Sequence, residues 1–304
     1  MTVQEFVGDF CTHVTVLIPD YNRERYILDA IDSVIAQDYS DWDILIVDDG
    51  SNDRWMEVVK SRMSDDRISL IHMEHGGPVA ATAIGIEHAR GPVITCLDSD
   101  DKLMPGALSA VMPSFEKNPR LGYVWTNWVD STGDKGSGDF LPEGKTLIEA
   151  VISGWWKGFT QRFFRKEFYL QTERLDTSTK YLVGVPIALL IAKTGCDTLH
   201  IPKVTYWRRI HPHRFTNGHY AEELEEMHLL RRKYSSGNAT LTELYTVGLE
   251  KEMDALRSEL MGIKKCFGYK FMGLYGSIID QTLPDGTRRG ELKRRVVDSL
   301  RGSS

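Results

Sequence analysis

The sequence predicts an α/β fold, a doubly wound, mixed but mainly parallel sheet flanked by helices, followed by a helical C-terminal extension. Three features lead to this prediction. Short β-branched stretches alternate with stretches whose apolar residues recur at helical spacing. The first strand-like stretches end in clusters of polar residues, as ligand-binding doubly wound sheets do. Towards the C-terminal end, a heptad pattern replaces this alternation.

The first strand–helix–strand unit spans residues 14–51. The β-branched stretch 14–18 ends at Pro19, and the stretch 44–47 ends in the polar sequence DDGS. Both stretches are typical of buried parallel strands. The apolar residues between them recur at three- and four-residue steps, which predicts a helix with one apolar stripe. These residues are Ile27, Ala30, Ile31, Val34 and Ile35.

The same pattern repeats over residues 68–101. A strand over 68–71 precedes a helix over 79–89 and a strand over 93–97, which runs into Asp98-Ser99-Asp100-Asp101. Because ligands bind doubly wound sheets at the carboxyl ends of the strands, we expect the three polar clusters to converge on one crevice.

The later elements are less regular. We predict a strand over 122–128, a helix over 182–192 that ends at Gly195, and a strand over 199–206. This gives one main domain over residues 1–217 and a helical extension over 218–304.

The extension carries two apolar patterns. Met253, Leu256, Leu260 and Ile263 continue a heptad seam that starts at Leu249, so this helix is expected either to pack on its own domain or to self-associate. The segment 288–301 is basic, with its apolar residues on one helical face. It is either a surface helix or an anchor on anionic lipid.

Composition narrows the classes of partner. The net charge of −6 and the pI near 5.9 argue against a nucleic acid, whose phosphates need a concentrated basic surface. The four cysteines are scattered, as expected of free thiols rather than of a zinc site. No leader-like or bilayer-spanning apolar run is evident. These features predict a cytoplasmic protein, with peripheral contact at the inner membrane face as an option.

The acidic cluster at 98–101 predicts a metal site. Several carboxylates at one strand end repel one another unless a divalent cation offsets their charge. Oxygen ligands of this kind suit Mg²⁺ or Mn²⁺, which commonly share their coordination with substrate phosphates. The alternative is a solvated turn or a helix N-cap.

Four motifs in order give a resemblance to a known family. The segments 16–22, 33–37, 47–53 and 97–101 read VLIPDYN, SVIAQ, VDDGSND and LDSDD. Together they resemble the family 2 glycosyltransferases with a Rossmann-like GT-A fold, and LDSDD is similar to that family's DxD motif. The resemblance covers about residues 13 to 216. Four motifs in order are far more specific than a lone glycine-rich loop. The resemblance implies a metal-dependent enzyme that uses a nucleotide sugar.

The resemblance also implies roles for single residues near the donor. Pro19, Tyr21 and Asn22 would border the nucleotide, with the Tyr21 ring able to stack on the base. Asp49 would accept a hydrogen bond from that base, and the imide of uracil is a suitable donor, so the sugar is expected on UDP. By the same analogy, Asp98 and Ser99 would lie near the ribose.

Metal and phosphate contacts follow from the same resemblance. Asp100 would hold Mn²⁺ or Mg²⁺, and His211, in the segment YWRRIH, would complete the metal shell, with His213 as the alternative. Arg209 or Arg208 would clamp phosphate, because guanidinium groups pair with it bidentately. The acceptor would be a glycan, lipid or protein in surface polysaccharide or glycoconjugate synthesis, and Trp155-Trp156 would either stack on a sugar or belong to the core.

Two positions depart from the family pattern. Gly184 and Val185 stand where inverting members place a Glu-Asp pair whose Asp deprotonates the acceptor, and Thr82-Ala83 stand where Arg-Asn is usual. Three hypotheses remain. Asp176, with Glu173 behind it, replaces the base; or transfer proceeds with retention and without an enzyme base; or the chain is a nucleotide-sugar-binding scaffold. A nucleotidyltransferase is disfavoured, because no glycine-rich, basic phosphate loop follows the first strand.

Overall fold

The computed structural model describes residues 13–136, 145–153, 161–212 and 219–267. The chain divides into two compact units, Met1–Tyr245 and Thr246–Ser304. The sheet and the helices through α8 belong to the first unit, and α9 (Ala239–Phe267) runs from the first into the second. The domain division expected at residue 217 stays a prediction.

The first half of the sheet follows the predicted alternation. Its strands are β1 (Val14–Asp20), β2 (Trp42–Asp48), β3 (Ile68–His72) and β4 (Val93–Cys96). They are parallel, in the order β3-β2-β1-β4. The connecting helices are α1 (Ile27–Ile35), α2 (Trp55–Val59) and α3 (Pro78–His88). The predicted strands and the helices α1 and α3 are therefore confirmed.

The second half of the sheet is mixed. Its strands are β5 (Lys102–Leu103), β6 (Leu121–Asp130), β7 (Lys135–Gly136), β8 (Arg162–Arg165) and β9 (Asp197–Arg208). Strand β8 lies between β4 and β6 and is antiparallel to both, whereas β6 and β9 are parallel. Short β5 and β7 pair antiparallel with β9 and β6. The mixed, mainly parallel sheet is confirmed, although the sequence did not indicate β8.

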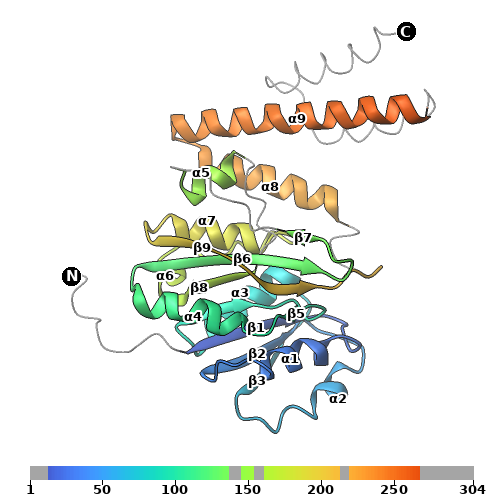
Figure 1. Cartoon of the computed structure of the whole chain (residues 1–304), viewed down its shortest axis with the longest axis vertical. Helices are drawn as coiled ribbons and strands as arrows, with labels where there is room; N and C mark the ends of the chain where they lie inside the picture. Colours follow the sequence, from blue (N-terminus) through green and yellow to red (C-terminus); the bar gives the residue numbers. More distant parts are fainter. Residues whose placement is uncertain (1–12, 137–144, 154–160, 213–218, 268–304) are drawn as a thin grey trace. The chain divides into compact units, whose positions relative to one another are not determined.

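Each face of the sheet has its own helices and its own core (Figure 1). Val16 and Ile18 of β1 face α1, α2 and α4 (Ala107–Lys117), and Leu17 faces the other side. That other side is covered by α3, α5 (Leu147–Ile152), α6 (Lys166–Leu170), α7 (Gly184–Ala192) and α8 (Tyr220–Ser235). Alternate residues of a strand point to opposite faces, so the buried strand β1 contributes Val14, Val16 and Ile18 to one core and Leu17 to the other.

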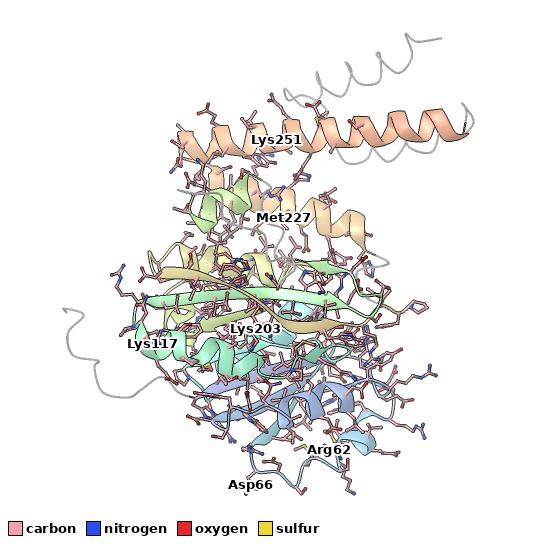
Figure 2. All side chains as sticks on the ribbon, viewed as in Figure 1. Arg62, Asp66, Lys117, Lys203, Met227 and Lys251 are labelled. Carbon is pink, nitrogen blue, oxygen red and sulfur yellow. The ribbon has the colours of Figure 1, made fainter. Side chains whose placement is uncertain are left out.

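Helix α8 is fixed to the segment that leads into α7. The Glu226 carboxylate accepts hydrogen bonds from the backbone N–H groups of Lys180, Tyr181 and Leu182, at 2.7, 2.9 and 3.1 Å. The next residue, Met227, is buried in the core on the α7 side (Figure 2). One polar and one apolar contact on the same turn thus hold the start of α8 against the start of α7.

Several sequence predictions concern the C-terminal part and the surface. The heptad residues lie within the single helix α9. The basic segment 288–301, Trp155-Trp156 and His213 lie outside the described residues. Within the described part of the chain, no helix is both long and apolar enough to cross a membrane.

Close packing of α3 on β1 gives a stability prediction. A Cβ atom added at Gly85 would overlap the side chain of Leu17, which is itself fully buried. Overpacking of this kind typically costs about 1–3 kcal/mol, and the better helix propensity of alanine returns at most ~1 kcal/mol. We therefore expect Gly85→Ala to lower the free energy of unfolding by about 1–2 kcal/mol in urea titrations. The exposed control His88→Ala should change it by only a few tenths, and an unchanged Gly85→Ala midpoint would contradict this packing.

Candidate active site

A cavity of about 510 Å³ opens at the carboxyl ends of β1, β2 and β4. Its other walls come from β8, from the segment before α7, and from the start of α8. Six of the site residues expected from the sequence line it. They are Pro19, Tyr21, Asp49, Asp98, Ser99 and Asp100. The predicted convergence of the three polar clusters is thereby observed.

An acidic triad occupies the turn after β4. Asp98, Asp100 and Asp101 each offer one carboxylate oxygen, and these oxygens lie within 4.8 Å of one another. Asp98 is exposed, while Asp100 and Asp101 are buried. Burial, and then repulsion from the other two carboxylates, raises the pKa of Asp101 to about 7. The turn therefore concentrates negative charge at the cavity wall.

Asp101 is held by Tyr206 of β9 and by Arg209, the residue that follows this strand. The Tyr206 hydroxyl donates to Asp101 Oδ2 at 2.7 Å, and the Arg209 backbone N–H donates to Oδ1 at 2.7 Å. Both oxygens of this carboxylate thus serve to join the turn to β9. Asp98 and Asp100 are the better placed members of the triad for a cation.

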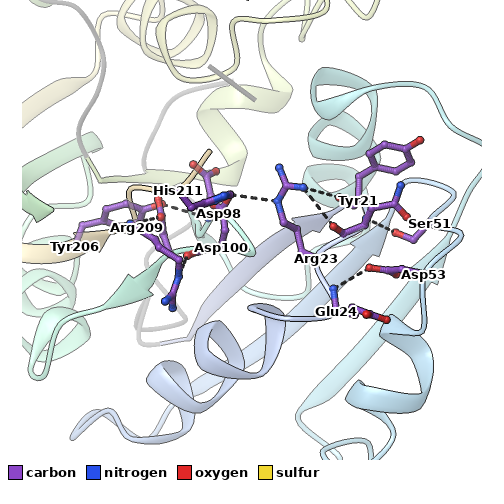
Figure 3. Close-up of polar contacts among 12 residues, drawn as sticks. Tyr21, Arg23, Glu24, Ser51, Asp53, Asp98, Asp100, Tyr206, Arg209 and His211 are labelled. Atoms are coloured by element: carbon purple, nitrogen blue, oxygen red, sulfur yellow. Dashed lines mark hydrogen bonds and ion pairs between the residues drawn. The ribbon is translucent and has the colours of Figure 1, made fainter. Parts of the chain in front are cut away.

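His211 reaches Asp100 from the chain that follows β9. Its Nε2 lies 3.0 Å from Asp100 Oδ2, which also accepts from Arg23 Nε at 3.2 Å (Figure 3). The imidazole is buried and does not itself line the cavity. Carboxylate oxygens suit Mn²⁺ or Mg²⁺, so Asp98 and Asp100 fit the predicted metal, whereas His211 reaches this cluster through its contact with Asp100. The role of His211 as a metal ligand stays a prediction.

Arg209 lies behind the triad rather than in the cavity. Its Nε donates to the Asp100 carbonyl at 2.9 Å, and its Nη2 donates to Asp29 Oδ2 at 2.6 Å. Its guanidinium carbon lies 4.9 Å from the ring centroid of Tyr26. Arg208 lines the cavity instead, with its Nη2 3.5 Å from Asp130 Oδ2. Of the two predicted phosphate clamps, Arg208 is therefore the one beside the cavity.

At the other end of the cavity, an aromatic ring and a carboxylate lie together. The Tyr21 ring is 39% exposed and stacks on His75, with 4.2 Å between centroids. The Asp49 carboxylate accepts from the N–H groups of Gly76 and Gly77 at 2.7 and 2.9 Å. Gly77 has φ +91°, which other residues rarely adopt, so glycine lets this loop turn towards Asp49. Asp49 thereby fixes the loop between β3 and α3.

Asn22 joins two loops instead of lining the cavity. Its backbone N–H donates to Ser51 Oγ at 2.8 Å, and its side-chain oxygen accepts from the Asn52 N–H at 2.9 Å. Its φ of 54° lies in the left-handed region, where asparagine is tolerated better than most residues. Asn22 therefore positions Tyr21 within the predicted nucleotide-binding segment.

Sequence reasoning did not single out Asp20, although it belongs to the motif VLIPDYN. Its carboxylate lines the cavity and is only 2% exposed. Burial first, and then the negative charges of Asp48 and Asp53, raise its pKa to about 7 despite the opposing Ser99 hydroxyl. Neither oxygen has a hydrogen bond of good geometry within the described residues. The local sequence could not reveal that Asp20 is buried, because its burial depends on the loops that cover the end of β1.

The structure does not bring Asp176 to the cavity. Asp176 is exposed, and its Oδ1 accepts from Ser178 Oγ at 2.6 Å and from the Ser178 N–H at 3.1 Å. These bonds lower the pKa of the Asp176 carboxyl. Glu173, the other candidate acid, forms an ion pair with Lys193 at 3.1 Å. Thr82 and the pair Gly184 and Val185 do line the cavity, so the departures from the family pattern lie in the site itself.

Further wall residues come from elements that the sequence did not place there. Arg162 of β8, and His219 and Glu223 at the start of α8, line the same cavity. Arg23, which bonds Asp100, was also missed. The sequence predicted that residues 218–304, and therefore α8, form an extension. In the structure, the first turn of α8 borders the cavity.

Comparison with known proteins identifies the family. The sequence model of glycosyl transferase family 2 matches residues 15–177, more than half of the 304 residues. The chain belongs to this family. The match includes β1 to β4 and the acidic triad, and the family assignment agrees with the resemblance seen in the four motifs.

Two curated relatives show the extent of the similarity. The glycosyltransferase GlyG of Streptococcus pneumoniae serotype 4 is 37% identical over 181 residues, which are 56% of this chain and 60% of GlyG. An uncharacterized glycosyltransferase of Rickettsia felis is 35% identical over 147 residues, which are 48% of this chain and 23% of that protein. The chain thus spans less than two thirds of the length of these relatives.

Solved structures share the fold over most of the chain. TarS 1–349 of S. aureus in complex with UDP-GlcNAc has a TM-score of 0.65 at 16% sequence identity. The superposition covers 89% of this chain and 81% of the TarS chain. The mannosyltransferase PcManGT of Pyrobaculum calidifontis, in complex with GDP-Man and Mn²⁺, has a TM-score of 0.57 at 16% identity, covering 96% and 88%. These likenesses confirm the GT-A-like fold.

Asp20 gives a prediction about pH. Its folded-state pKa of about 7 lies above the ordinary 3.8, so between these values the folded protein keeps a proton that the unfolded chain has lost. Stability should therefore fall as pH rises from about 4 to about 7. Asp20→Asn should remove this loss and raise the free energy of unfolding by on the order of 1–3 kcal/mol at pH 8, with little change at pH 4.

Urea titrations at pH 4, 6 and 8 measure this difference. The raised pKa of Asp101 also makes the free energy of unfolding fall as pH rises. The Asp20→Asn variant should therefore keep part of the pH dependence. An Asp20→Asn variant that is less stable than the wild type at pH 8 would contradict the buried, unsatisfied carboxylate.

Proposed function

We propose that the chain transfers a sugar from a UDP-sugar to an acceptor hydroxyl with the help of Mn²⁺ or Mg²⁺. The observation that carries this proposal is the presence of two complementary ends in one cavity. Tyr21 and Asp49 suit a nucleobase at one end, and Asp98 and Asp100 suit a cation with a diphosphate at the other. Family membership and the nucleotide sugars in the TarS and PcManGT complexes support it.

The nucleobase end of the cavity combines a ring for stacking, Tyr21, with a hydrogen-bond acceptor that is held in place, Asp49. A nucleobase placed against Tyr21 would gain a flat aromatic partner at the cavity rim. Gly76 and Gly77 donate one N–H bond to each oxygen of Asp49, and His75 Nδ1 lies 2.9 Å from Oδ2. The second lone pair of Oδ1 is therefore the position for a further donor. The imide N–H of uracil would fill such a position, and the loop N–H groups orient Asp49 for it.

The charge balance of the cavity supports a cation at the diphosphate end. Among the described residues, six carboxylates line the cavity, against three arginines. The arginines are Arg23, Arg162 and Arg208. A diphosphate would be repelled by this excess of negative charge at close range. When bound, Mn²⁺ or Mg²⁺ would offset that repulsion and stabilise the charge on the departing diphosphate.

The chain's own residues would orient this end of the donor. Arg23 and His211 both contact Asp100 Oδ2, so they fix the direction in which this carboxylate presents its other oxygen. Tyr206 and Arg209 hold the turn from behind through Asp101. Arg208 reaches the cavity wall, where a guanidinium would bind phosphate oxygens.

A second candidate function is nucleotide-sugar binding without transfer. The specific observation in its favour is that Gly184 and Val185, which carry no acid, stand in the cavity where a base is expected. Turnover distinguishes the two functions. A scaffold would bind UDP with the cation and release no sugar, whereas an enzyme would at least hydrolyse its donor slowly.

Calorimetry tests the proposal directly. UDP should bind in Mn²⁺ and lose at least about 10- to 100-fold in affinity in EDTA, because the diphosphate then meets uncompensated carboxylates. Asp100→Asn should show a similar loss in Mn²⁺. The matched control Asp66→Asn, at an exposed carboxylate in the loop before β3 and outside the cavity (Figure 2), should bind as the wild type does.

Two results would count against this function. Equal affinity for UDP in EDTA and in Mn²⁺ would refute the role of the cation. Tighter binding of GDP than of UDP would refute the assignment of uracil to Asp49, while leaving a nucleotide-sugar site in place.

A further inference from the structure

One wall of the cavity is built by α7 and α8 rather than by strand ends. Gly184 and Val185 open α7, and the rest of that helix is apolar and almost entirely buried. Where relatives are expected to carry a Glu-Asp pair, this chain has Gly184 and Val185, neither of which is acidic. Any carboxylate on this wall must therefore come from another element.

Helix α8 brings such a carboxylate. Glu223 lies in its first turn, is only 8% exposed, and lines the same cavity as Gly184 and Asp100. A carboxylate with so little exposure is uncommon, since burying a charge costs free energy.

The position of Glu223 is fixed by contacts on the next turn. Glu226, three residues on and therefore on the same helical face, binds the N–H groups of residues 180–182. The Tyr181 ring also packs against His219, with 5.0 Å between centroids. The first turn of α8 is thus held against the segment that enters α7, and Glu223, Gly184 and Val185 line the same cavity.

The other five cavity carboxylates lie at the strand-end side of the cavity. Asp49 binds the glycine N–H groups, Asp101 binds Tyr206 and Arg209, and Asp20 is enclosed at the end of β1. Asp98 and Asp100 form the candidate cation site. All five follow β1, β2 or β4, whereas Glu223 is the one carboxylate in the described lining that comes from the α7–α8 wall.

We propose that Glu223 is the general base of the transfer reaction and replaces the Asp that is expected at Val185. The inference rests on the proposed function. The Glu223 carboxylate takes the proton of the acceptor hydroxyl while the hydroxyl oxygen forms a bond to the anomeric carbon. The bond from that carbon to the β-phosphate oxygen breaks, and its electron pair leaves with UDP. Attack from the side away from the leaving group inverts the anomeric configuration.

Donor hydrolysis tests the assignment without a known acceptor, because water then takes the place of the hydroxyl. UDP release is measured in Mn²⁺ with UDP-glucose, UDP-galactose, UDP-GlcNAc, UDP-GalNAc and UDP-glucuronate. With the donor that the wild type turns over fastest, Glu223→Gln should be about 10²- to 10⁴-fold slower, the usual effect of removing a general base. Its affinity for UDP and its thermal midpoint should match those of the wild type.

Two matched variants control this comparison. Glu222→Gln changes an exposed carboxylate on the same turn of α8 and should keep the wild-type rate. Asp176→Asn removes the candidate base expected from the sequence and should also keep it, because Asp176 lies outside the cavity. A rate for Glu223→Gln within about threefold of the wild type, or a loss in Asp176→Asn as large as in Glu223→Gln, would overturn the assignment.

Two further measurements separate a base from a structural residue. The wild-type rate should rise with pH until the base is ionised, and this limb should be absent in Glu223→Gln. Formate should partly restore hydrolysis in Glu223→Ala, because a small carboxylate can occupy the vacated space. Absence of both effects would overturn the proposal, as would UDP binding by a wild type that hydrolyses none of the five donors. Failure of the wild type to bind UDP would instead refute the proposed function, and the inference with it.

Discussion

Electrostatic repulsion within the turn after β4 is the constraint on which the rest of the site depends. Three carboxylates lie within 4.8 Å of one another, and two of them are buried. The protein offsets part of this cost itself, since Tyr206 and the Arg209 backbone bind Asp101, and Arg23 and His211 contact Asp100. The remaining charge faces the cavity. A divalent cation with a diphosphate is the kind of ligand that completes such an arrangement.

Sheet topology explains how these distant residues meet. Tyr206 binds Asp101 across 105 residues of sequence, because β9 runs parallel to β6 and its far end reaches the turn after β4. On the other wall, the contacts of Glu226 with residues 180–182 place α8 beside α7. The end of the cavity with Tyr21 and Asp49 is thus built by local loops of the first strands, and the end with the acidic triad and the α7–α8 wall by elements far apart in the chain.

This difference sets the limit of sequence-based prediction. We could predict that Pro19, Tyr21, Asp49 and the acidic triad meet, because each lies at or just after the carboxyl end of a parallel strand and such ends share one edge. Strand β8 and the place of α8 could not, since their pairing depends on long-range packing rather than on local periodicity. For the same reason Arg209 was expected at phosphate, whereas its guanidinium binds Asp29 and the Asp100 carbonyl.

The most direct test of the account is anomalous diffraction at the manganese edge from crystals grown with UDP and Mn²⁺. We expect one strong anomalous peak in the cavity, within coordination distance of Asp100 and of both phosphates of UDP. The uracil ring should lie between Tyr21 and Asp49. UDP bound in the cavity with no manganese peak at Asp98 and Asp100, or a peak away from these carboxylates, would contradict it.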